Sequence, residues 1–468
     1  MKKILLLNPP GRNRYLRDQH CSSAAKADYY WPAADLLVLS GMLHNVFEIK
    51  VIDAIVQGYG MKHVLDIIRE GDFYAVIALT SSASRDEDFA LFAKIKSDGG
   101  PLMIANGGFL REKPADFLER FDFLDALILD YTQKGIIDFL VQGPCTDYPG
   151  LGYRRGRRVV INNARDMSGK EFSYPMPRHE LFPLRAYRTP QARRFPFTCA
   201  IISSGCPYAC RFCSSAGVPF RLRNRGDVLE ELIALRRAGI SEIHFPDFTF
   251  TADREHAAEI CRAMIKEKTN LSWDCLTRAD CFDAQLAGLM KRAGCHTIQF
   301  GVESKNETVL RALAKPIKNS AVKQAFSLCK KEGIETIGFF IIGLPGEDEA
   351  SMRQTIGFAR ELDCDYAAFS VFVPDFGSAL RGRLEEANPH LKDNYSFDRT
   401  KFPVLGNEFL SRQKIWLMRN QAVREFYFRP GYVWKRLRSI GNFRRFITAC
   451  KIFWSLLFAR KGRDRAMT

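Results

Sequence analysis

Two runs of alternating strand and helix patterns constrain the fold of this 468-residue chain more than any other feature. In the first run, short apolar segments alternate with helical patterns. We expect strands at residues 4–7, 47–52, 75–79, 102–105 and 126–129, and helices at 34–44, 62–70, 89–96 and 136–141. Apolar strands separated by helices are typical of a parallel sheet that is covered on both faces. The first run therefore predicts an α/β domain with a Rossmann-like parallel sheet over residues 1–142.

A second run of the same kind follows farther along the chain. We expect its strands at residues 198–203, 242–245, 271–275, 297–301, 335–343 and 367–373, and its helices at 227–238, 254–267, 283–293, 320–332 and 349–362. Six strand–helix units predict a partial TIM barrel, (βα)6, over residues 196–385. The chemistry of such barrels takes place at the carboxyl ends of their strands.

The remaining segments differ from both runs in composition. Residues 143–195 are rich in Pro, Gly and Arg and are interpreted as a linker. Residues 386–468 are helical in pattern, aromatic and basic, and 401–468 carry 16 Lys and Arg against three acidic residues. This C-terminal region is interpreted as helices that cover the barrel, with peripheral contact to an anionic membrane or a lipid-like substrate as the alternative. No nucleic-acid recognition fold accompanies the charge, and no run of eighteen apolar residues predicts a membrane span.

A short loop after the first barrel strand contains three cysteines, Cys206, Cys210 and Cys213. Three thiolates bind three irons of a cubane, which leaves the fourth iron open to a chelating small molecule. A zinc site normally needs four protein ligands, and no second pair of cysteines follows nearby. The loop predicts a 4Fe–4S cluster, with structural zinc or three buried cysteines as the alternatives. Thirteen cysteines without an export signal favour a reducing compartment, and we expect the protein in the cytoplasm.

The spacing C-x-x-x-C-x-x-C, with Phe212 before the last cysteine, resembles the signature of radical S-adenosylmethionine (SAM) enzymes. Further family motifs follow at the ends of the later strands, in the stretches 247–250, 277–280, 300–304 and 339–347. The resemblance implies that SAM chelates the open iron and that reduction of the cluster cleaves SAM to a 5′-deoxyadenosyl radical. It also implies a set of SAM-binding residues, namely Phe212, Asp247, Arg278, Glu303, Gly343 and Gly346.

Several of these residues have a plainer structural interpretation as well. Asp247 suits the N-cap of a helix, and Glu303 suits an ion pair with a lysine. The guanidinium of Arg278 suits either the SAM carboxylate or a structural carboxylate. Gly343 and Gly346 allow close approach of an adenine, or simply a turn.

The N-terminal domain resembles the cobalamin-binding class of the same family, in its opening Leu-Leu-Leu-Asn-Pro-Pro, its Gly107-Gly108 turn and the Pro-rich linker. The loops 8–30, 80–84 and 106–109 are expected to form one crevice that faces the mouth of the barrel. Ser81, Ser82, Gly107 and Gly108 would contact cobalamin there. The family motif Asp-x-His-x-x-Gly, whose His ligates cobalt, is absent from the first loop, so a lower cobalt face without histidine is expected.

The resemblance implies a cobalamin-dependent C-methyltransferase that acts on an unactivated carbon of a small-molecule or lipid-like substrate. Such an enzyme needs an electron donor such as flavodoxin or ferredoxin. Two alternatives within the family are a cyclase or oxidoreductase of tetrapyrrole or hopanoid type and a cobalamin-free radical SAM enzyme. A non-enzymatic iron–sulfur or metal-storage protein is the alternative outside it.

Overall fold

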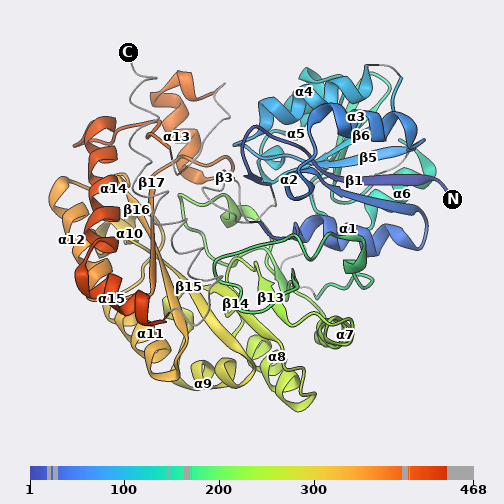
Figure 1. Ribbon diagram of the computed structural model, residues 1–468. Helices are drawn as coiled ribbons and strands as arrows, with labels where there is room; N and C mark the ends of the chain where they lie inside the picture. Colours follow the sequence, from blue (N-terminus) through green and yellow to red (C-terminus); the bar gives the residue numbers. More distant parts are fainter. Residues whose placement is uncertain are drawn as a thin grey trace.

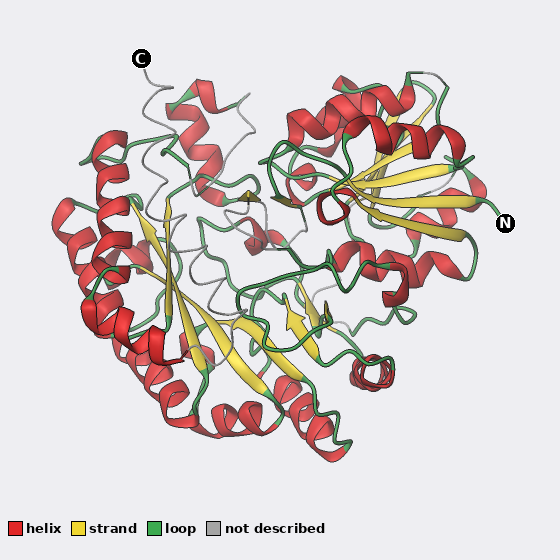
Figure 2. Ribbon diagram, in the orientation of Figure 1, coloured by secondary structure: helices red, strands yellow, loops and turns green. Residues whose placement is uncertain are grey.

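The computed structural model describes residues 1–17, 23–24, 30–97, 99–145, 147–162, 169, 171–392, 399 and 401–439. The chain forms two α/β bodies that lie side by side (Figure 1). The N-terminal body, in blue, lies at the upper right, and the barrel, in green to orange, curves around the lower left. In each body a sheet of mostly parallel strands carries helices outside it (Figure 2).

The first sheet has the strand order β4-β1-β5-β6-β7-β8-β9, and its first five strands are parallel. Its parallel strands are β1 (Lys3–Asn8), β4 (Glu48–Asp53), β5 (Ala75–Leu79), β6 (Leu102–Asn106) and β7 (Ala126–Ile128). Its helices are α1 (Ala34–His44), α2 (Ala54–Gln57), α3 (Met61–Glu70), α4 (Arg85–Lys96), α5 (Pro114–Arg120) and α6 (Gly135–Gln142). The predicted Rossmann-like parallel sheet is confirmed.

Strand β1 illustrates why these segments are apolar throughout. Leu5 and Leu7 are buried in one hydrophobic core, whereas Ile4 and Leu6 are buried in another. Helix layers on both faces of the sheet therefore exclude water from every side chain of the strand. A strand of this kind reads as a continuous apolar run rather than as an alternation.

The segment 143–195, interpreted as a linker, contains two strands of the first sheet. Within it, β8 (Leu151–Arg155) pairs antiparallel with β7, and β9 (Arg158–Asn162) pairs antiparallel with β8. The two strands extend the first sheet beyond residue 142. The short hairpin turn at Gly156, which has a positive φ of 60°, was not recognised because arginines mask the strand pattern on both sides of it.

The second sheet has the strand order β10-β13-β14-β15-β16-β17 and is parallel throughout. Its strands are β10 (Phe197–Cys199), β13 (Glu242–Phe245), β14 (Ser272–Thr277), β15 (Cys295–Glu303), β16 (Glu335–Ile342) and β17 (Tyr366–Val371). Helices α7 (Arg225–Arg237), α8 (Arg254–Lys266), α9 (Ala284–Arg292), α10 (Glu307–Ala312), α11 (Asn319–Glu332) and α12 (Glu349–Glu361) alternate with them. This arrangement confirms the predicted six-stranded partial barrel.

The inner face of the barrel is polar. Ile243 and Phe245 of β13 belong to the core beneath the outer helices, so the alternating His244 faces inward. The His244 Nδ1 atom is hydrogen-bonded to the Asp274 carboxylate (2.8 Å), and the Gln299 side-chain amide donates to the same carboxylate (2.9 Å). Complete TIM barrels fill this space with branched apolar side chains. The polar interior here is suited to a bound molecule rather than to a packed core.

The C-terminal region covers the last barrel strands with helices, as expected. Its helices are α13 (Ala379–Ala387), α14 (Arg412–Tyr427) and α15 (Pro430–Ser439). Tyr427 of α14 donates to the Ala367 carbonyl of β17 (2.8 Å). None of the helices in the described ranges is long and apolar enough to cross a bilayer. The remainder of the basic tail, 440–468, lies outside the described residues.

The two bodies meet through loops at the carboxyl ends of their strands. In Figure 1, β1 runs from the N-terminus toward the barrel, so the carboxyl edge of the first sheet faces it. Asp130, which follows β7, pairs with Arg221 (2.7 Å) in β12 (Arg221–Leu222), next to the cysteine loop. Glu112, which follows β6, accepts from the backbone N–H of Gly377 (2.8 Å), beyond the end of β17. These contacts join loops at the carboxyl edge of the first sheet to the barrel, which agrees with the expectation that this edge faces the barrel mouth.

Candidate functional site

The cysteine loop is held from below by a buried carboxylate. Asp247, which follows β13, accepts hydrogen bonds from the backbone N–H groups of Ile202 (3.1 Å) and Ser203 (2.6 Å) and from the Ser203 hydroxyl (2.7 Å). Its side chain is fully buried, and burial raises its pKa to about 6. Asp253, rather than Asp247, caps α8. Asp247 therefore orients the segment that leads into the loop. This role differs from the two that the sequence suggested for it, a contact to SAM and a helix N-cap.

Gly205 makes the sharp turn between β11 (Ser203–Ser204) and Cys206. Its φ is +77°, and a Cβ atom there would lie 2.1 Å from the Pro219 carbonyl oxygen. Any other residue would meet both backbone strain and a steric clash. The turn places Cys206 against the returning segment, where its N–H donates to the Val218 carbonyl (3.4 Å).

The three thiols fit a cubane cluster. Cys210 is buried, whereas Cys206 and Cys213 are partly exposed. Burial raises the pKa of the Cys206 and Cys210 thiols, and the electrostatic influence of Cys213 on both indicates that the three sulfurs are neighbours. Within the described ranges, no three His, Cys, Asp or Glu side chains converge on one metal ion. A cubane takes each thiolate on a different iron, so its ligands do not need to converge on one point.

Arg278 places a cationic group directly beside the loop. Its Nη1 donates to the Cys210 sulfur (3.6 Å), and its guanidinium carbon lies 3.9 Å from the centre of the Tyr208 ring. Its Nε and Nη2 donate to the two carboxylate oxygens of Asp280 (3.0 and 2.8 Å). This bidentate ion pair matches the structural interpretation, and a SAM carboxylate would have to share the guanidinium with Asp280.

Glu303 forms the ion pair that was considered as its alternative role. It accepts from Lys315 Nζ (2.7 Å), which also donates to the Gly301 carbonyl (2.9 Å). Both side chains are largely buried, and Glu303 has a φ of +63° at a shift in the register between β15 and β16. Such backbone strain in a non-glycine residue is common where a site requires a particular geometry.

Lys315 is a site residue that the sequence analysis missed. Its ammonium group lies 6.0 Å from the centre of the Phe212 ring, and its charge lowers the pKa of Cys210 against the larger effect of burial. The local sequence Ala314-Lys315-Pro316 does not indicate that this lysine is part of a functional site. Only the folded barrel brings it near the cysteine loop.

Phe212 belongs to an apolar cluster around the loop. The cluster consists of Cys210, Phe212, Val309, Leu313, Ile341, Leu344 and Phe372. Its members come from the loop, from α10 and from the ends of β16 and β17. These apolar side chains exclude water from one side of the thiols. Phe212 lies where it would be next to an iron–sulfur cluster held by the loop.

The two glycines after β16 were expected to allow close approach of an adenine or to form a turn. Gly343 has a φ of +87°, and a Cβ atom there would lie 2.8 Å from Ile415 of α14. Gly346 has a φ of +83°, and its N–H donates to Glu408 (3.0 Å). Gly343 thus admits a helix of the C-terminal region, and Gly346 forms a turn.

The predicted cobalamin residues lie at the carboxyl ends of β5 and β6, as expected. The Ser81 hydroxyl is buried and bonded to that of Ser84 (2.8 Å), while Ser82 is partly exposed. A Cβ atom on Gly107 would lie 2.4 Å from the Thr80 carbonyl oxygen, so the close approach is to the neighbouring loop. Gly108 begins a short 3-10 helix, Gly108–Arg111, and is partly exposed.

A buried polar network beneath this edge was not predicted. Arg17 forms an ion pair with Asp88 (2.8 Å), with both side chains fully buried, and donates to Asn8 (3.1 Å). Asn8 donates in turn to Asp53 (2.9 Å), which also accepts from the Tyr187 hydroxyl (3.0 Å). The network fixes the ends of β1 and β4 relative to the segment that enters the barrel.

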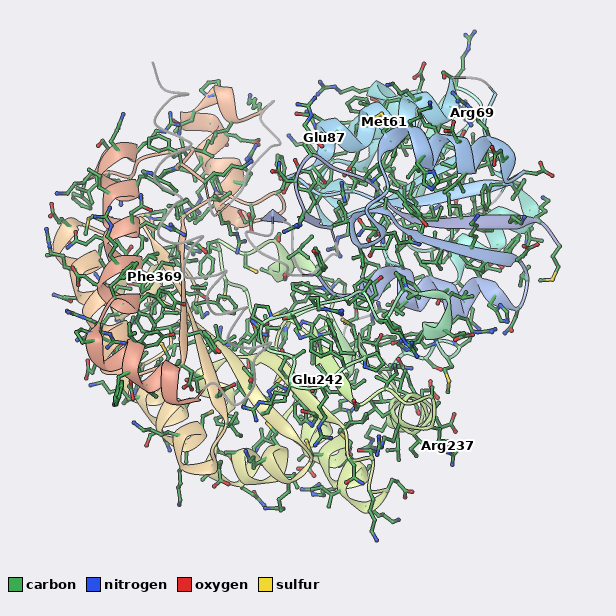
Figure 3. All side chains as sticks on the ribbon, viewed as in Figure 1. Met61, Arg69, Glu87, Arg237, Glu242 and Phe369 are labelled. Carbon is green, nitrogen blue, oxygen red and sulfur yellow. The ribbon has the colours of Figure 1, made fainter. Side chains whose placement is uncertain are left out.

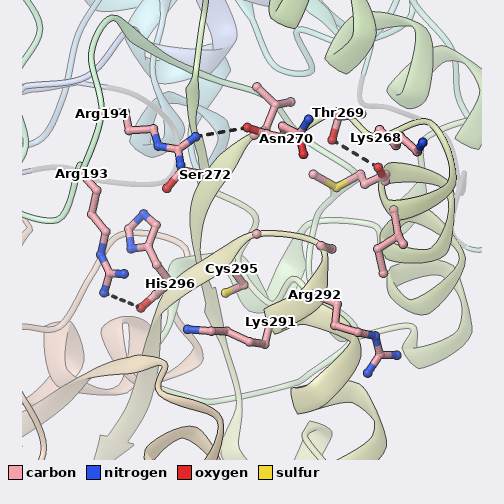
Figure 4. Close-up of a pocket in the computed structure, with 15 residues that line it drawn as sticks. Arg193, Arg194, Lys268, Thr269, Asn270, Ser272, Lys291, Arg292, Cys295 and His296 are labelled. Carbon is pink, nitrogen blue, oxygen red and sulfur yellow. Dashed lines mark hydrogen bonds between the residues drawn. The ribbon is translucent and has the colours of Figure 1, made fainter.

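A cavity of about 640 Å³ lies at the opposite, amino-terminal end of the barrel (Figure 4). It is lined by Arg193, Arg194, Lys268, Lys291 and Arg292 among others, and by no acidic residue. Figure 3 places Glu242 at the same lower end of the barrel. Barrel chemistry belongs to the other end of the strands, so this cavity is not the cofactor site.

The comparisons with known proteins agree with this architecture. Residues 200–359 match the family model of the radical SAM superfamily. An uncharacterized methyltransferase of Pyrococcus horikoshii is 29% identical over 439 residues, which cover 92% of this chain and 93% of that protein.

Two solved structures resemble both bodies of the chain. The radical SAM methyltransferase TsrM of Kitasatospora setae, with cobalamin and a 4Fe–4S cluster bound, gives a TM-score of 0.66 at 18% identity over 83% of this chain and 75% of TsrM. The cobalamin-dependent SAM radical enzyme OxsB, with aqua-cobalamin and SAM bound, gives a TM-score of 0.71 at 15% identity over 95% of this chain and 69% of OxsB. At such identities the likeness establishes a shared fold. Residues 200–359 thus match the radical SAM superfamily, and the two bodies of the chain together have the fold of these two cobalamin-dependent enzymes.

Proposed function

We propose that the chain is a cobalamin-dependent radical SAM methyltransferase that methylates an unactivated carbon of a small-molecule or lipid-like substrate. The observation that carries the proposal is the position of the cysteine loop. The loop offers three thiols and lies beside Arg221, which pairs with Asp130 at the carboxyl edge of the N-terminal sheet (2.7 Å). A cofactor on that edge would face a cofactor on the loop across one space.

Cys206, Cys210 and Cys213 would hold the cluster, Phe212 and Glu303 would contact SAM, and the loops after β5 and β6 would hold cobalamin. When bound, the cluster and SAM supply a 5′-deoxyadenosyl radical, and methylcobalamin supplies the methyl group. The contact residues on the cobalamin side would be Ser81, Ser82, Gly107 and Gly108.

The residues around the loop would orient and shield these groups. Asp247 fixes the backbone that presents Cys206, and its burial prevents the carboxylate from turning outward. Arg278 and Lys315 place two positive charges beside Cys210, which offset the negative charge of the bound cluster. The apolar cluster around Phe212 would exclude water, which would otherwise compete with SAM for the open iron.

The substrate would occupy the barrel interior. The pair of His244 and Asp274 offers hydrogen bonds there, and the Trp31 ring of the N-terminal domain lies 5.3 Å from the His244 ring. Both bodies therefore contribute side chains to this part of the barrel interior. A substrate with polar groups suits these walls better than a wholly apolar one.

An acidic electron donor such as flavodoxin or ferredoxin would reduce the cluster, and we place the enzyme in the cytoplasm, where thiols stay reduced. The strongly basic composition, with a net charge of +16, would favour association with such a donor. Peripheral membrane contact through the basic tail remains a separate hypothesis, because residues 440–468 lie outside the described part of the chain.

The test is anaerobic reconstitution with iron, sulfide, cobalamin, a low-potential reductant and SAM that carries a deuterated methyl group, followed by mass spectrometry of candidate substrates. We expect 5′-deoxyadenosine together with a product that has gained the labelled methyl group. The Cys213→Ala variant is the control. Deoxyadenosine without a labelled product would instead indicate a ring-forming or oxidising enzyme. Failure of the reconstituted protein to retain cobalamin would contradict the proposal.

A further inference from the structure

Arg221 has more unpaired buried donors than any other arginine in the described part of the chain. Its side chain is 3% exposed. Its Nη2 donates to Asp130 (2.7 Å) and to the Thr132 hydroxyl (2.6 Å), whereas Nε and Nη1 have no hydrogen-bond partner. The Phe172 ring, 5.0 Å away, covers the guanidinium. Buried donors without an acceptor cost free energy, so an acceptor is expected at this place.

Two other buried arginines near the proposed site, Arg17 and Arg278, use all their donors within the protein. In Arg17, all three nitrogens donate to Asn8, to backbone carbonyls or to Asp88. In Arg278, all three nitrogens donate to Asp280 or to Cys210. Local folding therefore explains these two residues but only one nitrogen of Arg221.

The position of Arg221 indicates what the missing acceptor belongs to. Arg221 pairs in register with Ser204, two residues before Cys206. Asp130 and Thr132 follow β7 at the carboxyl edge of the N-terminal sheet. The guanidinium therefore lies between the cluster loop and the edge at which a cofactor of the N-terminal domain would bind.

We propose that the unpaired N–H groups of Arg221 bind a carbonyl oxygen on the periphery of the corrin ring of cobalamin. The corrin ring carries amide side chains, which supply neutral oxygen acceptors, and a guanidinium forms strong charge-assisted bonds to them. The inference rests on the function proposed above. It makes Arg221 a binding residue that joins the corrin, the first sheet and the cluster loop.

The carboxylate of SAM has the same acceptor chemistry and is the second possible source. The anchoring of Nη2 at Asp130 and Thr132 favours the corrin, because it ties the guanidinium to the N-terminal sheet. The thiol loop already has two other cations, Arg278 and Lys315, on the side of the barrel. The experiment therefore measures the two cofactors separately.

The test uses the full chain with its cluster reconstituted and compares Arg221→Lys and Arg221→Met with the wild type. Lysine keeps the charge and can keep the pair with Asp130, but it lacks the additional donors. The matched control is Arg223→Lys, two residues away, because Arg223 is equally buried and its Nη1 donates to Glu231 and the Ile201 carbonyl, which leaves only Nε without a partner. Hydroxocobalamin affinity is measured by absorbance after gel filtration, SAM affinity by calorimetry without cobalamin, and folding by iron content and thermal unfolding.

Both Arg221 variants should bind cobalamin roughly tenfold or more weakly, with iron content and SAM affinity unchanged. Arg223→Lys should retain cobalamin affinity even where it lowers the unfolding temperature. Wild-type cobalamin affinity in Arg221→Lys would overturn the inference and leave the proposed function standing, since ordered water would then satisfy the donors. Loss of SAM affinity alone would assign Arg221 to SAM. A wild-type protein that binds no cobalamin would reject both proposals.

Discussion

Individual residues around the cysteine loop depend on one another, because most of them are buried and charged. Arg278, Lys315, Glu303 and Asp247 each have a named partner within hydrogen-bond distance. Asp247, Arg278 and Glu303 lie at or just after the ends of strands, whereas Lys315 lies between α10 and α11. Their interactions can therefore be tested one pair at a time.

The cysteine ligands give the first prediction at this scale. Cys206→Ala, Cys210→Ala and Cys213→Ala should each lose the cluster's visible absorbance and the formation of 5′-deoxyadenosine, because two thiolates cannot hold a cubane with an open iron. Cys145→Ala, an exposed cysteine far from the loop, is the control and should keep its iron. A full iron and sulfide content in any loop variant would refute the ligand assignment.

The buried ion pair of Lys315 and Glu303 gives the second prediction at this scale. Lys315→Met should lower the free energy of unfolding by about 3–5 kcal/mol, because it leaves a buried carboxylate without its cation. Adding Glu303→Gln should recover part of this loss, since the amide carries no charge. Chemical denaturation of the four proteins of the cycle measures the coupling. Strictly additive losses would indicate that the two side chains do not interact in solution.

At the scale of secondary-structure elements, the docking of α14 depends on Gly343. Gly343→Ala should lower the unfolding free energy by about 1–3 kcal/mol, because alanine is strained at a φ of +87° and its Cβ would meet Ile415. Gly382→Ala is the matched control, since nothing lies within 4 Å of the added Cβ and Gly382 is in a helix. Thermal unfolding compares the two variants. Equal stability would contradict the close approach of α14.

The strands and helices were predictable to the extent that their apolar pattern is local. Strands β13 and β16 were expected within a residue of their observed ends, because both are buried runs bounded by polar turns. The hairpin β8–β9 was not, because its arginines hide the alternation and its partner β7 is remote in sequence. Element boundaries follow local sequence, whereas the pairing of an edge strand follows tertiary contacts.

The candidate site was predictable in the same uneven way. The three cysteines stand out because a rigid spacing on one loop carries a chemical meaning. Lys315 and Arg221 carry no such spacing, and only the fold brings them to the loop. Gly343 was expected to admit an adenine or to form a turn, and the approach of Ile415, more than seventy residues away in sequence, could not be read from the local pattern. The assignments of Phe212 and of the cobalamin-side residues Ser81, Ser82, Gly107 and Gly108 stay predictions.

For the whole molecule, the network around Asp53 predicts a dependence of stability on pH. Burial raises the pKa of Asp53 from 3.8 to about 6 against opposing hydrogen bonds from Val56, Tyr187 and Asn8. A carboxyl whose pKa is higher in the folded state stabilises the fold when protonated, and this stability is lost as the pH rises through 6.

The prediction is made relative to Asp53→Asn, which does not titrate. Between pH 5 and pH 7.5, the wild type should lose roughly 1–2 kcal/mol of unfolding free energy relative to the variant. Urea denaturation at several pH values measures the difference. Parallel pH profiles for the two proteins would show that Asp53 keeps an ordinary pKa in the folded state.

The hairpin β8–β9 also determines where this protein can be recombined with a relative. It belongs to the first sheet, although it follows the last helix of the parallel part, so a chimera joined at residue 142 would separate β7 from its antiparallel neighbour. The unpaired edge would then expose Ala126, Leu127 and Ile128, which are now fully buried. A junction after Asn162 keeps the sheet whole, provided that the donor also retains the tyrosine that Asp53 binds. The N-terminal segment that can be exchanged as a whole is therefore about twenty residues longer than residues 1–142, which form the parallel part of the sheet and its helices.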